Sequence, residues 1–432
     1  MNSALAPQEG HTFNGLGIAP AILDVLGKLG YVTPTPIQLQ AIPHGVEGKD
    51  VIGVAQTGTG KTLAFGVPMI QRLLASEGKG LILLPTRELA LQVDETIQKI
   101  GRPLGIRTTV FIGGTGMGGQ ISSLNRDPHI VIATPGRLLD HLAQRTIRLN
   151  KVEMLVLDEA DRMLDMGFWP QVQKVISMIP GKRQTMLFSA TLSREITDLA
   201  VAQMSLPTRI EVAPQGTTAD KVSQEFFIVR KDQKMQLLEK VLNDYRGATL
   251  VFTRTKHGAT KIMRGIKAMG HSAAEIHGNR SLNQRKEALE GFKTGRYRVL
   301  VATDIASRGI DVKGIELVLN YDLPTDSADY VHRIGRTARA GTEGHAVSFA
   351  MPDQRREVRD IEHLIRKTVP ITQLPTLPPA RAAIPYIEDE PRGFRGGRGG
   401  SPRPFRTNGI ARGGYSRGGS STSRPKTFRR GR

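Results

Sequence analysis

In Met154-Leu155-Val156-Leu157-Asp158-Glu159-Ala160-Asp161, four apolar residues pass directly into a cluster of acids. Earlier in the chain, the stretch Gly58-Thr59-Gly60-Lys61-Thr62 combines two closely spaced glycines with a lysine and a threonine. A glycine-rich loop of this kind exposes backbone N–H groups that cradle phosphates. Together, the loop and the acids at the end of an apolar strand predict a magnesium–nucleotide site.

Each polar side chain of these two stretches has a role in such a site. Lys61 is expected to reach the β- and γ-phosphates and the Thr62 hydroxyl to meet Mg²⁺. Since Mg²⁺ prefers oxygen ligands and keeps several waters, one carboxylate on a rigid strand end, Asp158, suits it as a ligand. Glu159 is placed to orient or deprotonate the attacking water.

Length and composition set the wider frame. A chain of 432 residues is too long for one compact core, which favours two domains and a tail. The sequence has 0 cysteines, which excludes disulfides and thiolate metal sites and fits a reducing compartment. The N-terminus lacks the pattern of a secretory signal, and no apolar run is long enough to span a bilayer. We therefore expect a soluble, cytoplasmic protein without a membrane partner.

The positive charge is concentrated at the C-terminal end. The formal net charge is +20, and residues 391–432 contribute +12 through eleven Arg and one Lys without any acid. Lys and Arg side chains neutralise phosphates and release condensed counterions, so a polyanion is the expected partner. The Gly/Arg/Ser-rich tail also carries scattered aromatic residues, a composition typical of disordered segments that stack on bases without sequence preference. A flexible tether without a binding role is the alternative.

Short apolar strands alternate with helical stretches in two successive sets, which predicts parallel sheets covered on both faces. The first set is Asp50–Val54, Gly80–Leu84, Thr108–Ile112, Ile130–Ala133, Met154–Leu157 and Thr185–Phe188. The second set is Val222–Val229, Ala248–Phe252, Ser272–Ile276, Arg298–Ala302, Leu317–Asn320 and His345–Phe349. We therefore predict an α/β protein with two similar domains.

The two sets echo one another in order. Leu81–Arg87 is similar to Thr249–Arg254, each a strand followed by a Thr-Arg turn, and Ile130–Pro135 is similar to Val299–Asp304. The repeat indicates two copies of one nucleotide-binding type of domain. Only the first copy has a phosphate loop, so the second must contribute something else.

With the ordered set of motifs in view, the chain resembles the DEAD-box RNA helicases from about Phe13 to Phe349. Its short N-terminal flank and basic Gly/Arg tail look most like bacterial members of the RhlE type. The resemblance implies two tandem RecA-like domains, each a mainly parallel sheet flanked by helices, and an RNA-stimulated ATP hydrolase that uses ATP and Mg²⁺. The expected divisions are a flank at 1–12, domain 1 at 13–210, a linker at 211–221, domain 2 at 222–370 and a disordered tail at 371–432.

The resemblance assigns an ATP site. Phe13 and Gln38 match the adenine-reading element, in which the glutamine amide pairs with the base and the ring stacks on it. Asp311 matches the residue that binds the ribose. The phosphate loop supplies the remaining contacts, from Gln56, Thr57, Gly58, Thr59, Gly60, Lys61 and Thr62.

The segment His332–Arg339 resembles the arginine-finger motif, with Arg336 and Arg339 expected on one helical face and directed at the γ-phosphate. Many family members have Gly where this chain has Ala338, a change that we expect to be tolerated. The family's coupling between nucleotide state and RNA grip falls on Asp161, Ser189, Thr191 and His332.

The RNA side is also carried over from the family, on residues whose hydroxyl, guanidinium and backbone N–H groups hold phosphates and sugars without reading sequence. These residues are Arg87, Gly114, Thr134, Arg137, Thr253, Arg254, Gly278, Arg285, Thr303 and Arg308. Contacts with 2′-hydroxyls would favour RNA over DNA.

Two other functions stay open at this point: an ATP-gated RNA clamp or scaffold, and a DNA helicase of the wider superfamily. The resemblance further implies roles in ribosome biogenesis or RNA degradation. We expect a monomer that binds structured or duplex RNA, with a tail that can recruit RNA-processing or ribosome-assembly proteins.

Overall fold

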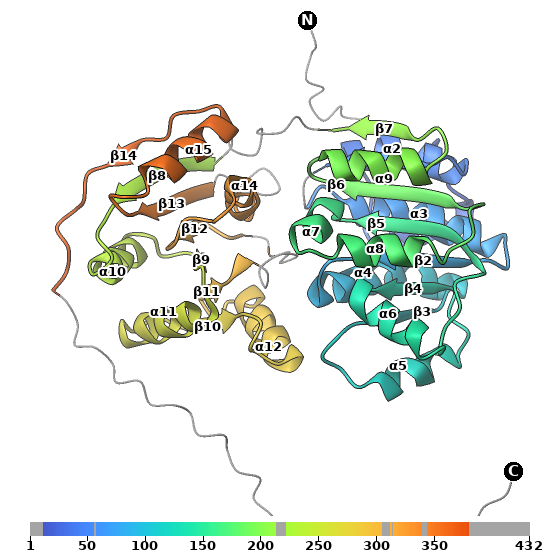
Figure 1. The fold of residues 1–432 in the computed structure, drawn as a ribbon, viewed down its shortest axis with the longest axis horizontal. Helices are drawn as coiled ribbons and strands as arrows, with labels where there is room; N and C mark the ends of the chain where they lie inside the picture. Colours follow the sequence, from blue (N-terminus) through green and yellow to red (C-terminus); the bar gives the residue numbers. More distant parts are fainter. Residues whose placement is uncertain are drawn as a thin grey trace, which may run out of the picture. The chain divides into compact units, whose positions relative to one another are not determined.

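The computed structural model describes residues 12–55, 58–212, 222–304, 312 and 314–338, and 344–379. Within them lie two sheets of seven strands, here called the first lobe (residues 12–212) and the second lobe (residues 222–379). Every described strand pair is parallel, which confirms the predicted fold class. Figure 1 shows the strands of the first lobe layered between helices.

The first lobe has the strand order β3-β4-β2-β5-β6-β1-β7. Its strands are β1 Val51–Val54, β2 Lys79–Leu83, β3 Thr108–Phe111, β4 Ile130–Ala133, β5 Val152–Asp158, β6 Gln184–Ser189 and β7 Thr208–Glu211. Its helices are α1 Pro20–Lys28, α2 Pro36–Val46, α3 Lys61–Leu74, α4 Arg87–Gly101, the 3₁₀ turn η1 Arg102–Leu104, α5 Met117–Leu124, α6 Pro135–Ala143, α7 Ala160–Asp165, α8 Trp169–Ile176 and α9 Arg194–Gln203.

Both faces of this sheet are covered, as the continuous apolar strands require. Along β5, Val156 packs on one face in a core shared with α1 to α4, while Leu155 and Leu157 pack on the other face in a core shared with α6 to α9. The strands are therefore rigid, and the polar residues that follow their carboxyl ends are held at one edge of the sheet.

The second lobe has the order β10-β11-β9-β12-β13-β8-β14. Its strands are β8 Val222–Ile228, β9 Thr249–Phe252, β10 Ala273–Ile276, β11 Val299–Ala302, β12 Leu317–Asn320, β13 Gly344–Ala350 and β14 Ile371–Thr372. Its described helices are α10 Lys234–Asp244, α11 Lys256–Ala268, α12 Leu282–Lys293, α14 Ser327–Ile334 and α15 Arg355–Ile365.

The two strand orders correspond one to one, from β3 and β10 at one edge to β7 and β14 at the other. The pairs that the sequence repeat matched, β2 with β9 and β4 with β11, occupy equivalent places. The prediction of two copies of one domain is thus confirmed.

Two of the predicted domain boundaries differ from the ends of the described lobes. The second lobe continues past residue 370, because β14 pairs with β8 and Leu374 and Leu377 pack against the lobe's core. Glu211, expected in the linker, is the last residue of β7, which pairs with β1. The rest of the predicted linker, apart from Val212, lies outside the described residues, as does the tail from residue 380.

Candidate nucleotide and nucleic-acid site

The phosphate loop ends at the first residue of α3, Lys61. Gly58 and Gly60 have φ values of +88° and +91°, a left-handed backbone that glycine adopts without strain. The loop therefore brings its backbone to the N-terminus of a 14-residue helix, where unpaired N–H groups and the helix dipole favour anions. Gln56 and Thr57 lie outside the described residues.

Lys61 faces the acids that end β5. Its Nζ lies 3.2 Å from Glu159 Oε1 and 3.7 Å from Asp158 Oδ1, and it donates to the Ala55 carbonyl at 3.1 Å. Burial alone would lower the pKa of Lys61, but the carboxylates of Glu159, Asp158 and Asp161 outweigh burial and raise it. The two predicted halves of the site therefore meet around a charged lysine.

Glu159 is held on both sides. Its other oxygen, Oε2, lies 2.8 Å from Arg162 Nη1, and its backbone is left-handed, with φ 58° and ψ 49°. The sequence reasoning did not select Arg162, although the spacing of three residues on a short helix is the signal that could have found it.

A magnesium ion fits the donor set. Asp158 offers a buried carboxylate, and Thr62 offers a hydroxyl in the first turn of α3. Burial raises the pKa of Asp158 to about 6, with the Glu159 carboxylate adding to the shift and Lys61 opposing it. In the described part of the chain, no three His, Cys, Asp or Glu side chains gather to hold a metal by themselves. Mg²⁺ kept by one carboxylate, a hydroxyl, waters and substrate phosphates agrees with that set.

Asp161 joins two of the predicted coupling segments. Its Oδ2 accepts hydrogen bonds from the backbone N–H groups of Ala190 and Thr191, both at 3.0 Å, and from the Thr191 hydroxyl at 3.3 Å. Its own N–H donates to Ser189 Oγ at 3.1 Å. The turn after β6 is therefore tied to the helix that begins beside Glu159.

Gln38 contacts the phosphate loop directly. Its Oε1 accepts from the Thr35 N–H at 2.9 Å, and its Nε2 donates to the Gly60 carbonyl at 3.0 Å. A Cβ at residue 60 would collide with this amide, which is a second reason for glycine there. The Phe13 ring is 4% exposed and packs in the core of the lobe, so its stacking on a base stays a prediction.

The predicted RNA-binding residues of the first lobe gather at the carboxyl ends of β2, β3 and β4. The Arg87 guanidinium lies so close to Gly113 and Gly114 that a side chain at residue 114 would overlap it. Arg137 Nη1 donates to the Thr115 carbonyl at 3.1 Å, and the Thr134 hydroxyl donates to the Phe111 carbonyl at 3.4 Å. One loop, residues 113–115, thus joins residues that the sequence spreads over fifty positions.

In the second lobe, Asp322 organises two of the predicted RNA contacts. Its Oδ2 accepts from the Thr253 hydroxyl at 2.9 Å and from the Arg254 N–H at 3.2 Å, and its Oδ1 lies 2.9 Å from Lys234 Nζ. The sequence reasoning missed Asp322 and Lys234, because a single acid after a strand carries no motif.

Ion pairs of the Glu275 carboxylate hold the turn that carries Gly278. The buried Glu275 carboxylate pairs with His277 Nε2 at 3.0 Å and with Arg280. Burial alone would raise the pKa of Glu275, but hydrogen bonds from His277, Arg280 and Thr260 lower it to about 2. Gly278 itself is exposed, and a Cβ there would meet nothing within 4 Å, so its backbone is open to a ligand.

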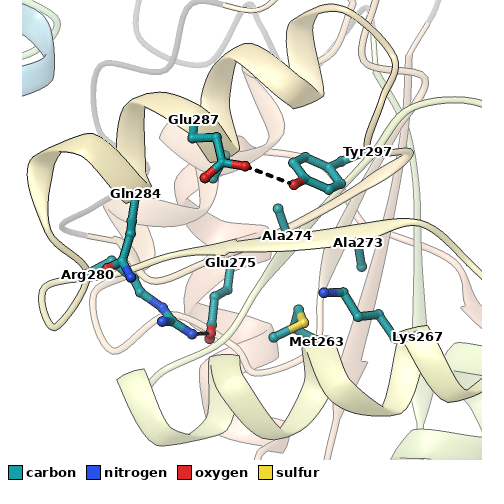
Figure 2. Close-up of a pocket in the computed structure, with 10 residues that line it drawn as sticks. Met263, Lys267, Ala273, Ala274, Glu275, Arg280, Gln284, Glu287 and Tyr297 are labelled. Carbon is teal, nitrogen blue, oxygen red and sulfur yellow. Dashed lines mark hydrogen bonds and ion pairs between the residues drawn. The ribbon is translucent and has the colours of Figure 1, made fainter. Parts of the chain in front are cut away.

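Arg280 and Glu275 also line a hollow of about 200 Å³ between α11 and α12. Figure 2 shows Arg280 reaching Glu275, and Glu287 on the opposite side accepting a hydrogen bond from Tyr297. Arg285 lies near the start of α12, and the Thr303 N–H donates to the Ile276 carbonyl at 3.3 Å.

Arg336 does not lie on a helix, contrary to the expectation for the arginine fingers. Helix α14 ends at Ile334, and Arg336 lies in the following turn, where its Nε donates to the His332 carbonyl at 3.3 Å. Ala338, which follows this turn, has a left-handed backbone with φ +53°, so an α-helix cannot continue through it. His332 Nδ1 lies 3.7 Å from Asp329 Oδ1. Arg339, Asp311 and Arg308 lie outside the described residues.

Arg333, between these residues, was not selected from the sequence. It forms a two-pronged ion pair with Asp304, at 2.5 Å and 2.7 Å, and donates to the Asp322 carbonyl at 2.7 Å. It therefore ties the helix before Arg336 to the ends of β11 and β12.

Comparison with known proteins agrees with this geometry. Residues 35–199 match the DEAD/DEAH box helicase model, and residues 233–341 match the helicase conserved C-terminal domain. The ATP-dependent rRNA helicase RRP3 of Meyerozyma guilliermondii is 44% identical, over 79% of this chain and 73% of that protein. The ATP-dependent RNA helicase CshA of Listeria monocytogenes is 42% identical, over 84% of this chain and 71% of that protein.

Two solved structures have the same fold over most of the chain. S. cerevisiae Dbp5 bound to RNA and ADP BeF3 superposes with a TM-score of 0.75 at 29% identity, covering 85% of this chain and 96% of that one. Mss116p bound to ssRNA and AMP-PNP superposes with a TM-score of 0.77 at 29% identity, covering 85% and 81%. The chain belongs to the DEAD/DEAH box helicases. The prediction of an ATP-dependent RNA helicase of the DEAD-box type, built from tandem RecA-like domains, is confirmed.

Among the described residues, none of the helices combines the length and the apolar composition that a membrane crossing requires.

Proposed function

We propose that the first lobe binds ATP at the start of α3 and hydrolyses it when RNA is bound, so that hydrolysis drives local opening of RNA duplexes or remodelling of RNA–protein complexes. The observation that carries this proposal is the cluster of Lys61, Asp158 and Glu159 at the N-terminus of α3. A triphosphate at that N-terminus offers Lys61 more negative charge than a carboxylate does. Lys61 then moves to the phosphates and releases one oxygen of Glu159.

In this proposal, the released oxygen of Glu159 orients or deprotonates the attacking water. Asp158 and Thr62 would hold Mg²⁺, largely through water. When bound, Mg²⁺ neutralises charge that develops on the phosphates. Gln38 hydrogen-bonds adenine, and its hydrogen bond to the Gly60 carbonyl links the bound base to the phosphate loop.

Replacing Glu159 by Gln tests this assignment. The amide keeps the shape but accepts no proton, so kcat for RNA-stimulated ATP hydrolysis should fall about 100-fold or more, while ATP and RNA still bind. Glu153→Gln is the matched control, since Glu153 lies on the same strand β5 but is exposed, and its kcat should stay unchanged. Undiminished hydrolysis by the Glu159→Gln variant would refute the role.

The second lobe completes the site in this proposal. Arg336 and Arg339 approach the γ-phosphate when ATP and RNA together close the two lobes, and Asp311 accepts from the ribose. The fork between Arg333 and Asp304 supports the approach, because it fixes the helix that precedes Arg336. His332, Asp161, Ser189 and Thr191 couple closure to the grip on RNA.

RNA recognition is assigned to backbone and sugar contacts along the carboxyl ends of both sheets, which hold RNA without reading sequence. An ATP-gated clamp is the remaining alternative to duplex opening. Strand displacement on a short RNA duplex, compared with RNA retention under a non-hydrolysable ATP analogue, separates the two. Stimulation of hydrolysis by RNA and not by DNA excludes the DNA helicase.

The proposed setting follows from charge and from relatives. Because RRP3 is named an rRNA helicase, ribosomal precursor RNA is a candidate substrate class, with decaying messenger RNA as the other. The tail 391–432, with its charge of +12, adds nonspecific RNA contacts and can recruit RNA-processing or ribosome-assembly proteins. We propose a cytoplasmic monomer.

A further inference from the structure

Arg162 forms a buried ion pair with Glu159. The Arg162 side chain is 1% exposed and that of Glu159 is 3% exposed, with 2.8 Å between Nη1 and Oε2. A charged group is costly to remove from water, and it stays buried only where a partner of opposite charge compensates it. The pair is therefore a fixed part of the site.

The left-handed backbone of Glu159 independently indicates that the contacts of this residue are fixed. A non-glycine residue in the left-handed region costs free energy and persists only where its surroundings over-determine it. Here the Glu159 N–H donates to Asp158 Oδ1 at 3.0 Å, while Lys61 and Arg162 hold the two carboxylate oxygens. These contacts orient the Glu159 side chain, and they outweigh the free-energy cost of its left-handed backbone.

The two oxygens of Glu159 have different partners. Lys61 takes Oε1 at 3.2 Å and Arg162 takes Oε2. Lys61 is the partner that the phosphates compete for, whereas Arg162 extends from α7 and does not belong to the phosphate loop. When Lys61 leaves, Oε1 becomes available and Oε2 stays anchored.

We propose that Arg162 is a positioning residue for hydrolysis: it anchors Glu159 through Oε2, so that Oε1 faces the attacking water. This inference rests on the proposed function of Glu159. Arg162 itself touches neither water nor phosphate in this account. Since a misplacement of about 1 Å can cost about 100-fold in rate, loss of the anchor lowers kcat and leaves ATP binding intact.

The test is a double-mutant cycle on the full chain, with Arg162→Met, Glu159→Gln and the double variant. Arg162→Met should lower kcat for RNA-stimulated ATP hydrolysis by about 10- to 100-fold, while the KM values for ATP and RNA change less than about 3-fold. In the Glu159→Gln background, single-turnover hydrolysis should change less than about 2-fold on adding Arg162→Met, because the anchored carboxylate is gone.

Arg162→Lys and Arg194→Met serve as controls. Arg162→Lys keeps the charge and should restore part of kcat, and it replaces the Met variant if that one fails to fold by circular dichroism. Arg194 is 92% exposed and pairs only loosely with Asp198, at 3.8 Å, so its loss should leave kcat unchanged.

The outcomes separate the two claims. If Glu159→Gln is slow and Arg162→Met costs as much in that background as in the native chain, or costs nothing in either, the positioning role is overturned while the proposed function stands. If Glu159→Gln alone hydrolyses ATP at the native rate, the proposed function fails first and the inference fails with it.

Discussion

At Glu159, backbone strain and two ion pairs meet in a single residue. The carboxylate lies between Lys61 and Arg162, and the left-handed backbone aims it there. Such strain is held where the surrounding contacts outweigh it, and functional sites are where it accumulates. The residue best placed to act on water is therefore also the one that the fold constrains most tightly.

A second left-handed residue, Ala338, is held by no ion pair like those of Glu159, although it packs, half-buried, against the core of the second lobe among the described residues. Alanine at φ +53° pays a steric cost that glycine avoids, of about 1–2 kcal/mol, although glycine returns part of it through the entropy of the unfolded chain. Ala338→Gly should therefore raise the free energy of unfolding by about 0.5–1 kcal/mol, measured by urea denaturation.

The matched control is Ala202→Gly in the exposed face of α9, which should lower stability by about 0.5–1 kcal/mol. A less stable Ala338→Gly variant would show that the packing of the methyl group against the core outweighs the relief of backbone strain.

Single residues were predictable where they belong to a motif. Lys61, Asp158 and Glu159 were found from spacing and chemistry, and the structure brings them together. Asp322 and Arg333 were missed because their partners lie far away in the sequence. Arg162 was missed although its partner, Glu159, is only three residues away, because the burial that makes this pair matter is not visible in the sequence.

Among the elements, the interior strands were the most predictable. All twelve predicted strands are present, with ends within two residues of the observed ones, because buried parallel strands are continuous apolar runs. The missed strands, β7 and β14, lie at equivalent edges of the two sheets. Their sequences, Thr-Arg-Ile-Glu and Ile-Thr, are short and polar, so only pairing with β1 and β8 makes them strands.

The turn after β10 yields a prediction at the scale of an element. Glu275→Gln removes the charge that holds Arg280 and His277, so the turn with Gly278 should loosen. We expect the RNA concentration for half-maximal stimulation to rise about 3- to 10-fold, at unchanged KM for ATP, and stability to fall by about 1–3 kcal/mol. Glu287→Gln, in the same hollow but with an exposed side chain, is the control and should change neither quantity.

Acid should erase this difference in stability. The pKa of Glu275 is lowered in the fold to about 2 from its ordinary value of 4.5, so its ionised form stabilises the native state fully above about pH 4.5 and progressively less as pH falls towards 2. Unfolding free energies of the native chain and of Glu275→Gln should therefore converge between pH 4.5 and 2. A gap that stays constant over that range would mean that packing, and not charge, accounts for the effect.

On the scale of the whole molecule, the two lobes use the same arrangement of a lysine and an acid for different functions. After β1 and its counterpart β8, each lobe starts a helix with a buried lysine, Lys61 or Lys234, that pairs with an acid beyond the end of the equivalent strand β5 or β12. Only the first lobe precedes its lysine with glycines. In the second, Lys234 fixes Asp322, which holds Thr253 and Arg254 for RNA.

That division of labour was predictable in outline, since the sequence repeat and the single phosphate loop already indicated two domains with unequal tasks. The corrected turn around Arg336 was not, because helix ends depend on local backbone conformation that composition does not reveal.

A crystal structure of the full chain with an oligoribonucleotide and a non-hydrolysable ATP analogue tests the central claim most directly. The account predicts Lys61 Nζ within hydrogen-bonding distance of the terminal phosphate and withdrawn from Glu159 Oε1, Arg162 still on Oε2, and the Arg336 guanidinium at the same phosphate. Lys61 still paired with Glu159, with Arg336 turned to solvent, would contradict it.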